Sequence, residues 1–99
     1  MYLVREVFTA VPGKASKLAQ MFKKMAGSMN ARVMTDMVGP YNTVVMEMEV
    51  ESMAQWEQQM KDHQSGKGME EMDEETKEGM SHYFEMYQSG RREIYKIVD

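Results

Sequence analysis

The sequence lacks cysteine, has only two prolines and contains no long apolar run. The absence of cysteine excludes disulfides, thiol catalysis and thiolate metal sites, and it makes a cytoplasmic location the expected one. No apolar stretch approaches the roughly 18 residues that a membrane-spanning helix needs, so we expect no membrane contact. The first ten residues, MYLVREVFTA, carry an acid and a base and lack a basic start, so we expect no signal peptide.

Basic residues are outnumbered by acidic residues, 12 to 16, and the imbalance lies in the second half of the chain. Residues 1–50 carry six basic and four acidic residues, whereas residues 51–99 carry six basic and twelve acidic residues. The acidic run EEMDEETKE at 70–78 fits a solvated helix face. Because it would repel phosphate groups, nucleic acid is not an expected partner.

Methionine is the abundant residue, with 14 in a chain of 99. Soft thioethers can bind Cu(I). Here, however, Met21 and Met25 follow helical spacing beside Leu18 and Phe22, which is typical of a buried helix stripe. Methionine also fills irregular gaps and adaptable surfaces. We therefore predict a packing role for these residues and no metal site.

The predicted elements follow the order strand, helix, strand, strand, helix, strand. Strands are predicted over 2–11, 31–38, 43–51 and 91–98 from their β-branched and aromatic content. Helical segments are predicted over 14–30, from a Ser52–Gln55 capping box to the interruption at 65–68, and over 69–88, where Ser89-Gly90 ends the helix. This order predicts a single α+β domain over residues 1–99. The domain is a ferredoxin-like βαββαβ sandwich whose four-stranded antiparallel sheet has its helices on one face.

The loop GPYN at 39–42 predicts how the two central strands pair. A short loop around Pro40-Tyr41 would place Val33 opposite Met48 and Thr35 opposite Met46, on an apolar face beneath the helices. The same register places Arg32 opposite Glu49 and Met34 opposite Glu47 on the other face. That second face mixes apolar and charged side chains.

A mixed face of this kind suits a dimer interface around a polar cavity. The first and last strands support this interpretation, because each has apolar residues on both of its faces, as Val4 and Leu3 or Ile94 and Tyr95 illustrate. Helices cover only one side of the predicted sheet, so a second sheet is the natural cover for the other. We therefore predict a homodimer.

Two segments carry a family resemblance. VPGKASKLAQMF resembles the Pro-Gly-Lys helix entry of the dimeric α/β-barrel (ferredoxin-like) superfamily. GPYNTVVMEMEVESMAQWE resembles a segment of its NIPSNAP-like branch in which a Gly-x-x-Asn turn, an apolar strand and a Ser-capped helix follow one another. Antibiotic-biosynthesis-type monooxygenases share the architecture. NIPSNAP-like chains often place a histidine or tryptophan in the third strand, where this chain has Met46 and Met48. The resemblance implies two subunits packed sheet to sheet.

The candidate site residues are few. Glu47 and His63 are the candidate general bases, Glu47 because burial near Asp36 would disfavour its ionised form. The candidate ligand-binding residues are Arg32, Asp36, Trp56, Tyr83 and Tyr87. The competing interpretations are a core tryptophan, a histidine at a helix end and an Arg32–Glu49 ion pair.

The resulting hypothesis is a homodimer that holds an aromatic or otherwise apolar small molecule between sheet and helices. It would act without a cofactor, as a monooxygenase or an isomerase. The alternative is a non-catalytic binding or assembly protein built on the same dimer. The sequence contains no nucleophile elbow, phosphate loop or dinucleotide fingerprint, so we expect no cofactor.

Overall fold

A computed structural model describes residues 1–26, 30–64, 74, 78 and 82–98, with the side chains of 63, 64 and 83 outside this description. The elements in this part are β1 (Tyr2–Ala10), α1 (Ala15–Met25), β2 (Arg32–Thr35), β3 (Thr43–Val50), α2 (Met53–Gln64), the 3-10 turn η2 (Tyr83–Glu85) and β4 (Tyr87–Lys96). The strands form one antiparallel sheet in the order β2-β3-β1-β4. The predicted α+β ferredoxin-like fold is confirmed.

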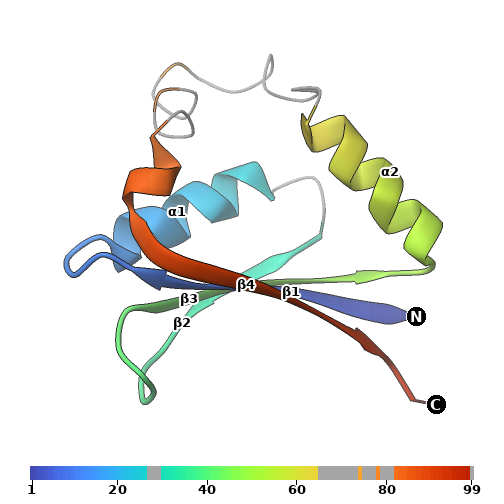
Figure 1. Cartoon of the computed structure of the whole chain (residues 1–99), viewed down its shortest axis with the longest axis horizontal. Helices are drawn as coiled ribbons and strands as arrows, with labels where there is room; N and C mark the ends of the chain where they lie inside the picture. The colour runs from blue at the N-terminus through green and yellow to red at the C-terminus, as the bar shows by residue number, and fades with distance from the viewer. Residues whose placement is uncertain (27–29, 65–73, 75–77, 79–81, 99) are drawn as a thin grey trace.

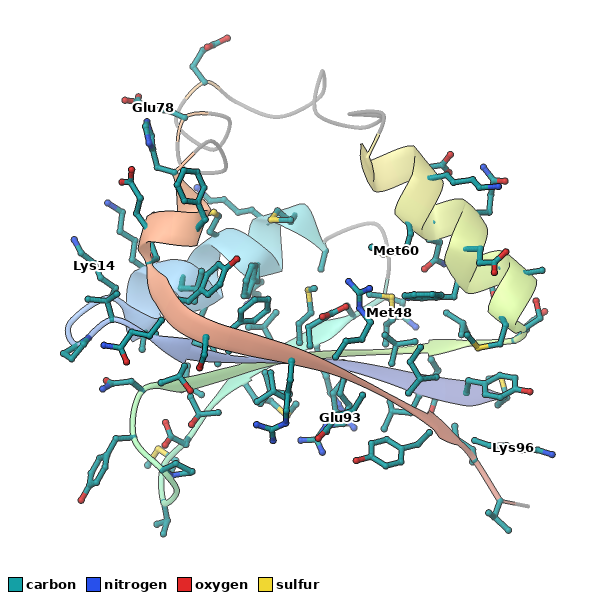
Figure 2. All side chains as sticks on the ribbon, viewed as in Figure 1. Lys14, Met48, Met60, Glu78, Glu93 and Lys96 are labelled. Carbon is teal, nitrogen blue, oxygen red and sulfur yellow. The ribbon has the colours of Figure 1, made fainter. Side chains whose placement is uncertain are left out.

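The two helices lie on the same side of the sheet, as Figure 1 shows. We call this side the covered face; it carries Val4, Phe8, Met46 and Met48 on the two central strands. The opposite side is the open face, and no helix of the described segments lies against it. Figure 2 shows Met48 and Met60 between the helices and the sheet, and Glu93 on the open face.

The core lies between α1 and the covered face. Leu18 and Phe22 of α1 are at most 2% exposed, and they pack with Val4 and Val44 of the central strands. Each such side chain contributes about 1.5–3 kcal/mol by leaving water. The helical spacing seen in the sequence predicted this stripe. The helix ends at Met25 rather than at residue 30, and residues 27–29, including Met29, lie outside the described residues.

The start of α2 confirms the predicted cap at Ser52, although Gln55 reaches back to Glu51 rather than to Ser52. The hydroxyl of Ser52 accepts the Gln55 backbone N–H at 3.1 Å, and the Gln55 side-chain oxygen accepts the Glu51 backbone N–H at 2.7 Å. The first bond satisfies a donor that the first turn of a helix leaves unpaired, and the second ties the preceding Glu51 to that turn. They fix the direction in which α2 leaves β3, and so the position of its residues over the sheet.

The predicted register of β2 and β3 is wrong by two residues. Arg32 lies opposite Glu47 and Val33 opposite Met46, because the connection between the strands is longer than predicted. Asp36 explains the difference: its carboxylate accepts the backbone N–H groups of Tyr41 and Thr43, at 2.9 and 3.1 Å. A shift of two residues leaves each side chain on its predicted face, so the assignment of faces is confirmed although the pairs are not.

The end of the last predicted helix is also wrong. Tyr87 and Gln88 begin β4, and Ser89-Gly90 lies within that strand instead of ending a helix. Gly90 is required there by close packing, because a Cβ atom at this position would lie 2.8 Å from the ring of Phe8. Because Gly90 has no side chain, the ring of Phe8 can pack against its backbone.

Candidate ligand-binding site

A cavity of about 190 Å³ lies between the covered face and the two helices. Its wall is largely aromatic and thioether, formed by Phe8, Met46 and Met48 from the sheet, Phe22 from α1, and Trp56 and Met60 from α2. Phe8 is fixed in place by a tilted contact with Phe22 and an edge-on contact with Tyr87, each at 4.9 Å between ring centroids. Flexible, polarizable methionine side chains beside rigid rings suit an apolar or aromatic ligand.

One side of the cavity wall is charged. Nε of Arg92, on β4, donates a hydrogen bond to Oε1 of Glu6, which lies opposite it on β1. The same guanidinium group lies 5.1 Å from the ring centre of Trp56. Glu6 has a side-chain exposure of 13%, so this carboxylate is nearly enclosed. The contacts of Arg92 join the far edge of the sheet to α2 across the cavity.

Gln59 adds a third polar group to the wall. It comes from α2, one helical turn from Trp56, and it lines the same cavity. Its Oε1 atom is buried and accepts no hydrogen bond from the part of the chain described here. Buried acceptors without a partner are uncommon because they are destabilising, so this one needs an explanation.

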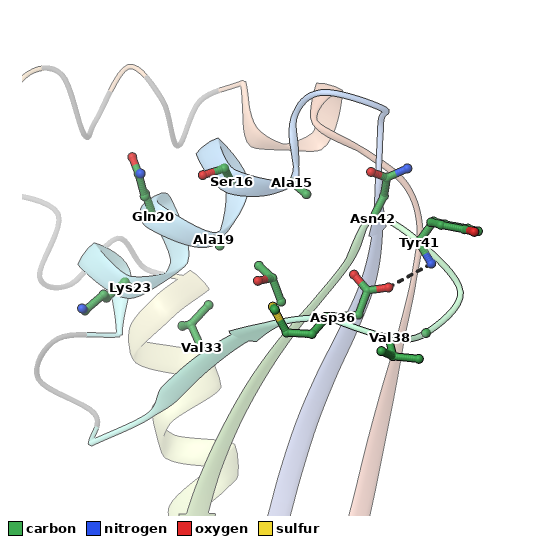
Figure 3. A pocket seen from close by; sticks show the side chains of 13 residues that line it. Ala15, Ser16, Ala19, Gln20, Lys23, Val33, Asp36, Val38, Tyr41 and Asn42 are labelled. Carbon is green, nitrogen blue, oxygen red and sulfur yellow. Dashed lines mark hydrogen bonds between the residues drawn. The ribbon is translucent and has the colours of Figure 1, made fainter.

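A second concavity, an open groove of about 710 Å³, runs between α1 and the β2–β3 loop (Figure 3). Ala15 and Ala19 form its helical side, and Asp36, Val38 and Tyr41 form its loop side. The Asp36 carboxylate already accepts two backbone N–H groups that hold the loop. Open shape and a carboxylate committed to the loop make this groove the weaker candidate for a small molecule.

The open face carries a row of alternating charges across all four strands, from Arg32 through Glu47 and Arg5 to Glu93. Glu47 is only 9% exposed, and Arg32 donates two hydrogen bonds to its Oε1 atom, at 2.7 and 3.0 Å. Nε of Arg5 lies 2.9 Å from Oε2 of Glu47, an ion-pair contact without hydrogen-bond alignment. The two arginines hold Glu47 from both sides.

Glu93 ends this row on β4. The hydrogen bond that Arg91 donates to it at 3.0 Å lowers the pKa of Glu93 below its ordinary value; the positive charges of Arg91 and Arg5 act in the same direction, and partial burial opposes them. The open face is therefore held in its observed arrangement by ion pairs among its own residues.

The structure separates the predicted site residues. Trp56 lines the cavity, but Arg32 and Glu47 lie on the opposite face of the sheet, and Asp36 holds the β2–β3 loop. The expected neighbour of Glu47 was Asp36, with Arg32 opposite Glu49; instead Arg32 pairs with Glu47 directly. Catalysis by Glu47 and ligand binding by Arg32 and Asp36 stay predictions. The contacts of these residues favour a role in stabilising the fold.

The other predicted residues are less informative. Tyr87 is at the start of β4, where its ring packs edge-on against Phe8 beside the cavity. His63 is in the last turn of α2 and Tyr83 begins η2, but both side chains lie outside the described residues.

Sequence reasoning missed the polar wall of the cavity, which consists of Glu6, Gln59 and Arg92. One signal was present: Glu6 interrupts the apolar alternation of Val4 and Phe8 on the covered face. A charged residue on a core face needs a partner. Arg92 could not be identified as that partner without the pairing of β1 with β4.

The described part of the chain has neither a metal-binding cluster nor a helix that could span a membrane. No group of three or more histidine, aspartate or glutamate side chains there could hold a metal ion. Neither α1 nor α2 is long and apolar enough to cross a membrane.

Solved structures share this fold. A NIPSNAP family protein from Agrobacterium tumefaciens superposes with a TM-score of 0.71 at 12% identity, covering 99% of this chain and 86% of that one. An uncharacterised NIPSNAP domain protein from Burkholderia xenovorans gives a TM-score of 0.62 at 11% identity, covering 99% and 95%. A NIPSNAP-like domain protein from the same organism gives 0.56 at 17% identity, covering 98% and 84%.

No family model matches the sequence, and no curated protein is significantly similar to it. The likeness is therefore one of fold, carried over nearly the full chain at low identity. It confirms the resemblance that the sequence segments suggested: the chain has the ferredoxin-like fold of NIPSNAP-family proteins.

Proposed function

We propose that this protein is a homodimer that binds a small aromatic or otherwise apolar molecule in the cavity between its sheet and helices. The observation that carries the proposal is the cavity itself, an apolar space of about 190 Å³ with a few polar groups in its wall. Ligand sites commonly combine these two properties.

The homodimer rests on the open face and its surroundings. Met34 and Tyr95 are 37% and 49% exposed there, and Met37 and Val38 of the β2–β3 loop are almost fully exposed. A second sheet packed on this face would remove such side chains from water. Light scattering at micromolar concentration is expected to give about twice the 11.5 kDa chain mass, and a clean monomer would contradict this part of the proposal.

Catalysis would use the same cavity. Glu6 is the carboxylate that lines it among the described residues, so an isomerase or cofactor-independent monooxygenase reaction would move its proton through Glu6. The alternative is binding without chemistry, and the salt bridge that commits Glu6 to Arg92 supports it. If the wild type converts a bound ligand and Glu6→Gln does not, the result would favour catalysis over binding without chemistry.

The binding test uses Trp56, the chain's only tryptophan, as its reporter. Toluene added to the protein is expected to change the emission of Trp56 in a saturable way. Met60→Phe, which adds volume inside the cavity, is expected to weaken this response. Met53→Phe on the same helix, at a position that does not line the cavity, is the control and is expected to retain it. An unsaturable response, or one equal in both variants, would contradict the proposal.

A further inference from the structure

We propose that the ligand is an uncharged molecule with a single aromatic ring and one O–H or N–H donor, and that the amide oxygen of Gln59 accepts this donor. The inference rests on the proposed ligand-binding function and specifies the chemistry of that same cavity. Three observations carry it: the size of the cavity, the pairing of its charges and the buried oxygen of Gln59.

The size of the cavity suits a ligand with one ring. An apolar cavity of roughly 150 Å³ is sufficient to bind benzene, so about 190 Å³ admits a ring with a few further atoms. The surrounding methionines, among them Met46, Met48 and Met60, place sulfur atoms around the space. Thioether sulfur makes favourable contacts with aromatic rings, which favours an aromatic ligand over an aliphatic one of equal size.

The charges in the wall favour a neutral ligand. Glu6 and Arg92 form a salt bridge with each other, and Arg92 also lies over the ring of Trp56. An anionic ligand would have to displace Glu6 from Arg92, or be buried without a counter-ion. A cationic ligand would compete with Arg92 for Glu6 in the same way. The compensated pair therefore selects against ligands of either charge.

The amide of Gln59 supplies specificity. Its Oε1 atom is buried and receives no hydrogen bond from the described residues, although the side chain lines the cavity. The last torsion of a glutamine side chain is soft, so a small rotation can turn the oxygen toward a bound ligand. A ligand O–H or N–H would satisfy this acceptor. Sites that hydrogen-bond a ligand donor discriminate strongly against analogues that lack it.

The test compares phenol with toluene, which have nearly the same shape and differ in the donor. Their affinities are measured by calorimetry for the wild type, for Gln59→Leu and for Gln58→Leu. Gln59→Leu is expected to lower the affinity for phenol relative to toluene by roughly tenfold, because one buried hydrogen bond is lost. Gln58 makes an exposed hydrogen bond to Asp62, so Gln58→Leu is expected to leave the ratio unchanged. Benzoate is expected to bind more weakly than phenol.

Each outcome addresses a separate statement. An unchanged phenol-to-toluene ratio in Gln59→Leu would overturn the role of Gln59, and tighter binding of benzoate than of phenol would overturn the neutral ligand. Failure of all three molecules to bind the wild type would contradict the proposed function itself. If Gln59→Leu does not fold, Gln59→Met, which keeps the length of the side chain, replaces it.

Discussion

The two faces of the sheet each carry arginine–glutamate contacts, but in different surroundings. On the covered face, the pair of Glu6 and Arg92 stands beside Trp56 at the wall of an apolar cavity. On the open face, Glu47 lies between Arg5 and Arg32 in a row of alternating charges. The first pair borders free space that a ligand can occupy, whereas the second is surrounded by its own partners.

This difference shows that a buried carboxylate is not by itself a sign of chemistry. The Glu47 side chain is slightly more buried than that of Glu6, and the sequence made Glu47 a candidate because of its expected burial near Asp36. Its contacts, however, tie three strands together. What distinguishes Glu6 is the cavity next to it, which depends on where α2 lies and cannot be deduced from alternation.

Mutations on the two faces of the sheet should differ most in how much stability they remove. Met48 on the covered face is 8% exposed, and its neighbour Glu49 on the open face is exposed. Met48→Asp buries a charge without a partner, so we expect it to destabilise the fold by about 3–5 kcal/mol. Glu49→Gln is expected to cost less than about 0.5 kcal/mol. Urea denaturation measures both, and equal losses would contradict the assignment of faces.

The next effect tests the structural role of Glu47. Glu47→Ala leaves Arg5 and Arg32 without their shared carboxylate, and we expect a loss of about 1–2 kcal/mol, limited by the exposure of Arg32. Glu49→Ala, on the same strand and face, is the matched control and should cost about 0.5 kcal/mol or less. Ligand affinity should be unchanged in both variants. A loss of ligand binding without a loss of stability in Glu47→Ala would restore the open face as the binding site.

A smaller effect contrasts two adjacent arginines of β4. Arg92 lies over Trp56 on the covered face, whereas Arg91 pairs with Glu93 on the open face. Arg92→Met removes the guanidinium from Trp56 and should shift the emission maximum of Trp56, with a loss of about 1 kcal/mol in stability. Arg91→Met should leave the emission of Trp56 unchanged. Identical spectra for the two variants would contradict the orientation of β4.

The smallest effect concerns the acid response of the open face. Because Arg91 and Arg5 lower the pKa of Glu93, its ionised form stabilises the fold above the ordinary glutamate value of about 4.5. This contribution is lost as the pH falls through the lowered pKa. Between pH 7 and pH 3, the wild type should therefore lose more stability than Glu93→Gln. Parallel losses, measured by urea denaturation at each pH, would contradict the account of this ion pair.

Local pattern predicted much of the fold and little of the site. The apolar spacing of Leu18 and Phe22, the Ser52–Gln55 cap and the alternation in β3 depend on neighbouring residues, and each is confirmed. The register of β2 depended on the Asp36 side chain, which lengthens the loop by bonding to its backbone. Gly90 was taken for a helix end, although its role is to accommodate Phe8 from another strand.

The polar wall of the cavity could not be predicted because it depends on strand pairing between residues that are still further apart in the chain. Glu6 and Arg92 are 86 residues apart in the chain and meet only because β4 pairs with β1. The row on the open face arises in the same way from three strand pairings. Such contacts follow from strand register, and the register of β2 and β3 depends on the bonds that Asp36 makes in their connecting loop.

Binding in the cavity is observed most directly by ¹³C NMR of the methionine methyl groups during titration with toluene. Met46, Met48 and Met60 line the cavity on the covered face, whereas Met34 lies on the open face at the edge strand β2. The first three methyl signals are expected to shift in a saturable way while the Met34 signal stays in place. A shift confined to Met34, with the three cavity methionines unchanged, would place the ligand on the open face and contradict binding in the cavity.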